Sequence, residues 1–255
     1  MTNHTDTIVL VPGGAGEVGA GIVQAFLDTG PTVIVPSRSQ DHLDDLHKHL
    51  ESTGTATDQL TSLVGNIGQI DGAKELRDDI LEQFGRVDTV VASLGGPQPI
   101  ERLIDVPQEM WDQVIDNFMT AHFVVARTFL PLLAEQDEGS YTMINGLSGP
   151  TGDIAAPASG LMAIASAGEH MLMRALAESA EHHGESVRIN ELVPLTPLIT
   201  RSRTNTDSEW MPAEEFGLVA VALAMEYNYH REAIGVYSQS DVRRWQVRSG
   251  EWTPV

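Results

Sequence analysis

Short apolar runs alternate along the chain with longer stretches in which apolar residues recur every three or four positions. The short runs are typical of buried strands and the periodic stretches of amphipathic helices. Strands are predicted over residues 7–12, 32–36, 60–65, 87–92, 140–147, 186–194 and 234–238. Helices are predicted over residues 41–51, 70–84, 108–134, 160–182 and 212–226. Strands joined by helices of this length form parallel βαβ units, so we expect an α/β fold, a doubly wound parallel sheet with helices on both faces.

We expect the whole chain, residues 1–255, to form a single domain. A chain of this length can bury a large core, and single α/β domains often reach this size. No linker-like segment interrupts the alternation, and residues 239–255 are predicted to be a C-terminal tail. In such a sheet, a ligand is expected at the carboxyl ends of the strands.

A glycine-rich turn, residues 12–19, follows the first predicted strand. Gly14, Gly16 and Gly19 have the G-x-G-x-x-G spacing, and a helix with apolar residues at intervals of four then runs to Gly30-Pro31. In a strand–turn–helix unit this spacing is typical of a Rossmann-type dinucleotide site, because backbone N–H groups at the helix N-terminus can approach a pyrophosphate. The alternative is a glycine turn that serves packing alone.

The composition narrows the possible partners. The chain has 36 Asp and Glu against 15 Lys and Arg, a formal charge of −21, and no cysteine. A polyanion is repelled by nucleic acid and by anionic membranes, so we expect neither as a partner. No apolar run approaches membrane-spanning length, and the run after the polar first residues is too short for a signal peptide core. We therefore expect a cytoplasmic protein.

Several motifs together resemble the short-chain dehydrogenase/reductase superfamily over nearly the whole chain. They are the glycine turn, Phe-Gly-Arg-Val-Asp at 84–88, Trp-Asp at 111–112, Arg-Ala-Leu-Ala at 174–177 and Val-Arg-Ile-Asn at 187–190. The resemblance implies an oxidoreductase that transfers a hydride between a nicotinamide cofactor and a small carbonyl or alcohol substrate. It also implies that the polar loop at about residues 195–211 is a substrate lid.

In that family the end of the second strand selects the cofactor. Pro36-Ser37-Arg38-Ser39 offers a guanidinium and two hydroxyls at this place, with no acid. A guanidinium pairs well with a 2′-phosphate, whereas an NAD site would place a carboxylate on the ribose hydroxyls. NADP(H) is therefore favoured over NAD(H); the alternative is that Arg38 is an exposed turn residue.

The resemblance implies further cofactor contacts. They are Gly13, Gly14, Gly16, Glu17, Val18 and Gly19 in the first turn, Ser37, Ser39, Asn66 and Ile67 after the next two strands, and Ser93 and Gly95 after the fourth. Glu17 is unusual, because its carboxylate suits the helix dipole but would repel a pyrophosphate on the same N–H groups. We predict that NADPH binds weakly, provided that Glu17 points outward.

The family's catalytic residues align with unsuitable side chains here. Alignment through residues 174–177 puts the usual tyrosine at Met162 and the usual lysine at Ser166, and no lysine follows Lys74. Neither residue can perform the proton transfer of a Tyr-x-x-x-Lys pair. Ser148 is the remaining catalytic candidate, with an ordinary turn hydroxyl as the alternative. His122 is predicted to fill a core or interface position, as is His170 on the other long helix. No residues have metal-ligand spacing, so no metal is expected.

The helices around residues 108–134 and 160–182 are more apolar than one sheet-facing stripe requires. In the resembled family both helices build a two-fold interface, so we expect a homodimer or homotetramer. The alternative is that both helices are buried within one subunit.

Three functions fit these features. The first is an NADP(H)-dependent oxidoreductase with an atypical site, in which Ser148, a histidine or water supplies the proton to a small-molecule substrate. The second is a dinucleotide-binding sensor or regulator without turnover. The third is a structural partner of an active relative that binds no cofactor.

Overall fold

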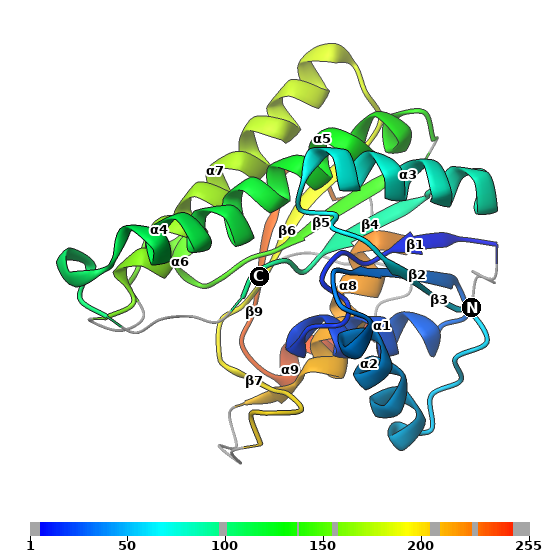
Figure 1. The fold of residues 1–255 in the computed structure, drawn as a ribbon, viewed down its shortest axis with the longest axis horizontal. Coiled ribbons are helices and arrows are strands. Elements are labelled where there is room, and N and C mark those ends of the chain that lie inside the picture. Colours follow the sequence, from blue (N-terminus) through cyan, green and yellow to red (C-terminus); the bar gives the residue numbers. More distant parts are fainter. Residues whose placement is uncertain are drawn as a thin grey trace.

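A parallel sheet of seven strands forms the centre of the structure (Figure 1). The computed structural model describes residues 6–96, 101–136, 138–154, 158–204, 210–225 and 229–246. The strands lie in the order β3-β2-β1-β4-β5-β6-β9, and all neighbouring pairs are parallel. Their bounds are β1 Ile8–Leu10, β2 Thr32–Ser37, β3 Leu60–Val64, β4 Thr89–Ala92, β5 Ser140–Ile144, β6 Arg188–Pro194 and β9 Ala233–Val236. A separate small sheet pairs β7 (Leu198–Ile199) with β8 (Met211–Pro212).

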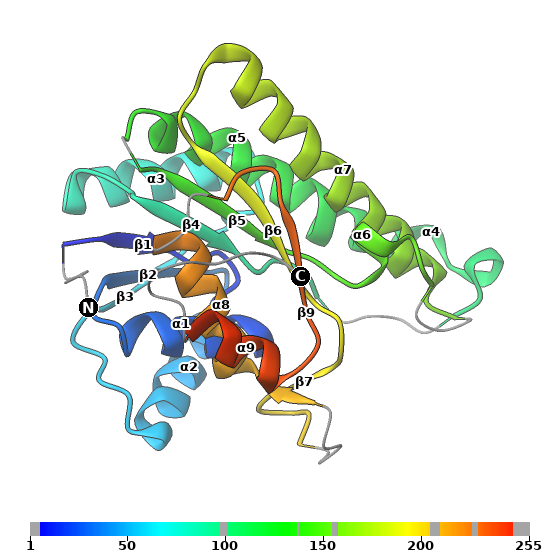
Figure 2. The same ribbon diagram turned by 180° about the vertical axis from the view of Figure 1, so that it is seen from behind.

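Helices cover both faces of the seven-stranded sheet, as the two opposite views show (Figure 1, Figure 2). One face carries α3 (Ile70–Phe84), α5 (Ala121–Ala134) and α7 (Gly160–His183). The other face carries α1 (Glu17–Leu27), α2 (Gln40–Thr53), α8 (Ala213–Met225) and α9 (Gln239–Gln246). Each layer has its own buried apolar cluster against the sheet. The predicted doubly wound α/β fold is confirmed.

The predicted helix over 108–134 is continuous but changes its geometry. It begins as α4 (Gln108–Ile115), passes through a π-helical turn at Asp116–Thr120 and continues as α5. π turns of this kind are rare and often occur at functional sites. Phe118 in this turn is buried and packs with Val114 of α4 and Leu161 of α7.

The fifth strand is shorter than the apolar pattern predicts. It ends at Ile144, and the short helix α6 (Ser148–Thr151) follows. The side chain of Asn145 redirects the chain here: its Oδ1 accepts from Gly146 N–H, and its Nδ2 donates to Ser166 O and to Glu191. Ser148 therefore lies at the start of a helix and not at a strand end. The predicted C-terminal tail likewise contains α9; residues 247–255 lie outside the described chain.

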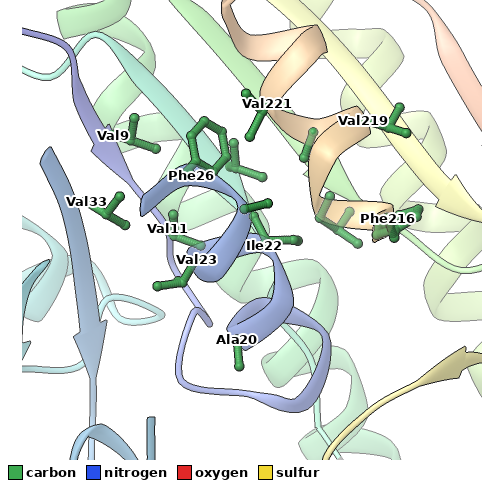
Figure 3. Packing of buried hydrophobic residues seen from close by; sticks show 14 of the residues in the cluster. Val9, Val11, Ala20, Ile22, Val23, Phe26, Val33, Phe216, Val219 and Val221 are labelled. Carbon is green, nitrogen blue, oxygen red and sulfur yellow. The ribbon is translucent and has the colours of Figure 1, made fainter. Parts of the chain in front are cut away.

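The packing of α1 fixes the position of the glycine turn. Figure 3 shows apolar side chains of α1, including Ile22 and Phe26, between those of the neighbouring strands and those of α8. α1 and α8 approach closely at two glycines: a Cβ on Gly21 would lie 2.4 Å from the backbone of Ala213, and one on Gly217 would lie 2.7 Å from Gly21 O. Among the described residues, no helix is both long and apolar enough to cross a membrane.

Candidate functional site

The glycine turn connects β1 to α1 at the carboxyl edge of the sheet. Gly13 has φ +79°, and a Cβ there would lie 2.1 Å from Ser93 O on the neighbouring β4 turn. A Cβ on Gly19 would lie 2.1 Å from Gly13 O. Ser93 N–H also donates to Pro12 O at 2.8 Å, so the two turns are tied together. These positions admit glycine alone because any side chain would enter backbone atoms.

The first turn of α1 has free backbone donors. Gly16 is the N-cap, and no side chain caps the helix there. The first N–H groups of an α-helix have no partner within the helix, and together with the helix dipole they favour an anion. The predicted contacts Glu17, Val18 and Gly19 all lie in this turn. The backbone of the turn therefore suits a pyrophosphate.

The predicted cofactor residues after β2 differ in whether their side chains already make hydrogen bonds. Ser39 caps α2 by accepting from His42 N–H, and Ser37 Oγ accepts from Ser39 N–H at 3.3 Å. Arg38 between them is exposed. Within the described residues, its guanidinium makes no hydrogen bond or ion pair. Arg38 is thus the group at this strand end that is free to bind a ligand anion.

The contacts predicted after β3 and β4 lie along the same edge of the sheet. Asn66 Oδ1 accepts from Gly68 N–H at 3.2 Å, which shapes the turn after β3. Ile67 is buried in the apolar cluster beside α3 and α5. Gly95 has φ +152°, and a Cβ there would lie 2.9 Å from the ring of Phe118. Asn66 and Ile67 thus shape and fill the β3 turn, whereas Gly95 allows the β4 turn to approach the π-helical turn.

The carboxylate of Glu17 points to the segment that follows β7. Ser202 donates to Glu17 Oε2 from both its backbone N–H and its Oγ at 2.9 Å, and Arg201 Nε lies 3.6 Å from Oε1. Arg201 also donates to Ala15 O at 2.9 Å. Although partial burial opposes the change, hydrogen bonds from Thr200 and Ser202 and the charge of Arg201 lower the pKa of Glu17. Glu17 is thus held by the predicted lid; residues 205–209 of that lid lie outside the described chain.

Ser148 lies after β5 and is mostly buried. Its hydroxyl makes no side-chain hydrogen bond within the described residues. Met162 is also buried and packs with Phe118 and the start of α7. Ser166 is buried one turn later on α7, and its Oγ lies 2.7 Å from where a Cβ on Gly146 would stand. Ser166 therefore lies beside the short segment of residues 146–148, which ends with Ser148.

A group of buried polar side chains from α5, β6, α7 and the turn after β5 lies near this segment. Glu191 of β6 is fully buried; Asn145 Nδ2 donates to one of its oxygens at 2.5 Å, and His170 Nδ1 lies 2.5 Å from the other. Glu169 of α7 is almost fully buried, with Oε1 3.6 Å from Nε2 of the fully buried His122. We name these five residues the buried polar cluster.

The two acids of the buried polar cluster, Glu169 and Glu191, are not among the site residues predicted from the sequence. The signal was present: Glu169 interrupts an apolar helix and Glu191 an apolar strand. Acids are almost never fully buried unless they have a partner. The expectation that His122 fills a core position agrees with its complete burial. His170, in contrast, is partly exposed and pairs with Glu191.

Burial disfavours a charge on both members of the inner pair, Glu169 and His122. Burial lowers the pKa of His122 to about 4, and the nearby backbone of Leu94 opposes this shift in part. Neither ring nitrogen of His122 makes a hydrogen bond with a described residue. Burial, and then the nearby charge of Glu191, raise the pKa of Glu169 well above its ordinary value. Burial, followed by the charge of Glu169, also raises the pKa of Tyr141. Burial thus favours the uncharged imidazole of His122 and the protonated form of Glu169.

Comparison with known proteins assigns the family. The model described as short chain dehydrogenase matches residues 7–209, so the chain belongs to the short chain dehydrogenase family of oxidoreductases. Members of this family generally bind NAD(P)(H), act on small molecules and form oligomers. Within the described residues, no group of three or more His, Cys, Asp or Glu is placed to hold a metal ion.

The individual relatives are distant. The chain is 24% identical to "Dehydrogenase/reductase SDR family member 4" of Caenorhabditis elegans over 52% of this chain and 50% of that protein. It thus spans about half the length of that relative. It is 26% identical to a 3-oxoacyl-acyl-carrier-protein reductase of Thermotoga maritima over 82% of this chain and 84% of that protein.

Solved structures agree on the fold. A short-chain type dehydrogenase/reductase from Mycobacterium ulcerans superimposes with a TM-score of 0.80 at 18% identity, covering 94% of this chain and 91% of that one. A Pseudomonas syringae protein described as a short chain dehydrogenase gives 0.79 at 22% identity, with 91% and 96% covered. At these identities the likeness extends to the fold alone.

Proposed function

We propose that this protein is an NADP(H)-dependent oxidoreductase that transfers a hydride to or from a small carbonyl or alcohol substrate. The proposal rests on the turn at residues 12–19. Its glycines occupy positions where a Cβ would clash with backbone atoms, and no side chain caps the first N–H groups of α1. These donors fit a pyrophosphate. The outward orientation of Glu17 removes the repulsion that would oppose such a ligand.

The preference for NADP(H) over NAD(H) rests on Arg38. It is exposed at the carboxyl end of β2, where a ribose 2′-phosphate would lie, and no described acid engages it. A guanidinium there makes charge-assisted hydrogen bonds to the phosphate. Ser37 and Ser39 border it. Asn66 and Ile67 would lie near the adenine, and Ser93 and Gly95 would border the cofactor after β4.

The proposed catalytic site is atypical. Bound NADPH supplies the hydride. Ser148 donates a hydrogen bond to the substrate oxygen and passes a proton to it directly or from water, since Met162 and Ser166 stand where the family's tyrosine and lysine are expected. The free hydroxyl of Ser148 beside the buried polar cluster supports this role.

The rest of the chain serves this site. We propose that residues 1–255 form one domain, with a substrate lid at about 195–211 and a C-terminal segment at 239–255. We place the protein in the cytoplasm, where nicotinamide cofactors are available. Phe123 of α5 and Met171 and Ile164 of α7 are exposed large apolar side chains, which supports a homodimer or homotetramer through these helices.

Two other functions are separated from this one by a single experiment. Purified protein is titrated with NADPH and NADP, and oxidation of bound NADPH is then measured against a panel of carbonyl compounds. Binding with turnover supports the oxidoreductase. Binding without turnover favours a dinucleotide sensor, for which the buried Met162 at the tyrosine position is the supporting observation. Failure to bind favours a structural partner of an active relative.

A further inference from the structure

We propose that Glu169 and His122 form a buried acid–base pair that holds a proton beneath the site and delivers it, through Ser166 and bridging water, to the substrate oxygen beside Ser148. This inference rests on the proposed oxidoreductase function. It gives a source for the proton in a chain that has no lysine after Lys74.

The pair is built from two helices on one face of the sheet. Glu169 lies on α7 and His122 on α5, with Oε1 and Nε2 3.6 Å apart and both side chains almost completely buried. That separation is too long for a direct hydrogen bond. Neither Glu169 Oε1 nor either ring nitrogen of His122 has a hydrogen-bond partner among the described residues. Buried polar atoms of this kind are commonly bridged by ordered water.

Charged and titratable groups surround the pair from each neighbouring element. Glu191 faces it from β6 and Tyr141 from β5, and His170 follows Glu169 on α7 itself. The Tyr141 hydroxyl is a further buried atom without a partner among the described residues. No described Lys or Arg pairs with Glu169. Because two buried carboxylates lie close together, a proton on Glu169 avoids repulsion with Glu191.

The pair connects toward the site along α7. Ser166 precedes Glu169 by three residues, so the two side chains lie on the same side of the helix. Ser166 Oγ in turn faces Gly146, two residues before Ser148. On its other side the cluster reaches solvent, because His170 contacts Glu191 and has a side chain that is 19% exposed. Ser166 thus lies beside Gly146 on the side of the site, and His170 lies beside Glu191 on the side of the solvent.

The step balances in the direction of reduction. The carbonyl carbon forms a new C–H bond with the hydride from NADPH, and the electron pair of the C=O π bond moves to oxygen. That oxygen takes a proton from the relay of Ser166 and bridging water. The O–H bond of Glu169 then breaks and returns a proton to this relay. The products are an alcohol, NADP⁺ and a Glu169 carboxylate, which regains its proton from solvent by way of Glu191 and His170.

The first test needs no turnover. Infrared difference spectra of wild-type protein against Glu169→Gln at neutral pH should show the C=O stretch of a buried carboxylic acid. Glu178→Gln is the matched control, because Glu178 lies on the same helix with an exposed side chain. A spectrum without a protonated-carboxyl band for Glu169 would overturn the proposal, even if the protein proves to be an active reductase.

The second test is kinetic. In a protein that binds and oxidises NADPH, Glu169→Gln should lower turnover at least tenfold and change its pH profile, while the NADPH dissociation constant stays within twofold of wild type. Glu169→Asp retains an acid and should recover part of the rate, a recovery that a purely structural role would not give. Full turnover in folded Glu169→Gln refutes the relay. A wild-type protein that binds NADPH but reduces no carbonyl refutes the reductase function, and the infrared band then decides whether the pair holds a proton.

Discussion

The two halves of the sheet handle polar groups in opposite ways. In the half formed by β1 to β4, the groups offered to a ligand are backbone amides and one exposed arginine, Arg38. In the half formed by β5, β6, α5 and α7, the buried acids Glu169 and Glu191 lie beside the buried His122 and the partly exposed His170. The first half follows its family pattern because a backbone site depends on glycine positions. The second half depends on side-chain pairs, which no local spacing along the chain specifies.

A side chain that closes the glycine turn should give the largest effect. Gly13→Ala should abolish measurable NADPH binding and destabilise the fold by roughly 3 kcal/mol or more, because the new Cβ enters Ser93 O and the backbone has φ +79°. Calorimetry and chemical unfolding measure both effects. Gly54→Ala is the matched control: Gly54 has φ +77° with nothing within 4 Å of a Cβ, so it should cost only about 1 kcal/mol and leave binding intact. Equal losses in both variants would contradict a steric role for Gly13.

The burial of His122 predicts a loss of stability in acid. Its pKa is lowered to about 4 in the folded state from 6.5, so below pH 6.5 the unfolded state binds a proton that the folded state refuses. The contribution of His122 to the free energy of unfolding therefore falls by about 3 kcal/mol in total as the pH drops from 6.5 to about 4. Urea unfolding across this range should show a shallower pH dependence in His122→Gln than in wild type. The exposed His182→Gln should retain the wild-type slope; identical slopes for all three proteins would place His122 outside the core.

The proposed catalytic role of Ser148 can be tested by removing its hydroxyl. Ser148→Ala should lower turnover at least tenfold, about 1.4 kcal/mol in the barrier, without changing the affinity for NADPH. Ser52→Ala, on the far helix α2, removes an exposed serine hydroxyl as a control. Steady-state rates with the best carbonyl substrate make the comparison. An unchanged rate removes Ser148 from the mechanism.

The contact of Arg201 and Ser202 with Glu17 is expected to give the smallest effect. Glu17→Gln removes the charge that attracts Arg201 and weakens the bonds from Ser202, so the segment should open more often. Trypsin cleavage after Arg201 should then be a few-fold faster, with Glu51→Gln as an exposed control. The lowered pKa of Glu17 means that the wild-type contact is lost only as pH falls through that lowered value. Equal cleavage rates in both variants would mean that Glu17 does not hold the lid.

Local pattern was sufficient for the strand, turn and helix that open the half formed by β1 to β4. The G-x-G-x-x-G spacing after an apolar run fixes a strand, a turn and a helix in one stretch of sequence, and the structure has all three. The orientation of Glu17 was not predictable in this way. Ser202 is 185 residues from Glu17 along the chain, and Arg201 precedes Ser202. Both residues come close to Glu17 only because of the fold.

The half formed by β5, β6, α5 and α7 depends on contacts that sequence periodicity does not encode. Leu147 extends the apolar pattern of β5, yet the strand stops at Ile144 because the Asn145 side chain bonds to α7 and β6. Glu191 and His170 are 21 residues apart and meet only because α7 packs across β6. Each residue by itself looks like an isolated polar interruption. Their pairing requires the parallel register of the sheet.

The proposed function rests on NADP(H) binding at the carboxyl edge of β1 and β2. Wild type and Arg38→Ala can be titrated with NADPH and with NADH under the same conditions. We predict saturable binding of NADPH that is tighter than that of NADH in wild type, with this preference lost in Arg38→Ala and the affinity for NADH unchanged. Absence of binding by either nucleotide at millimolar concentration, or an equal preference in both proteins, would contradict the account.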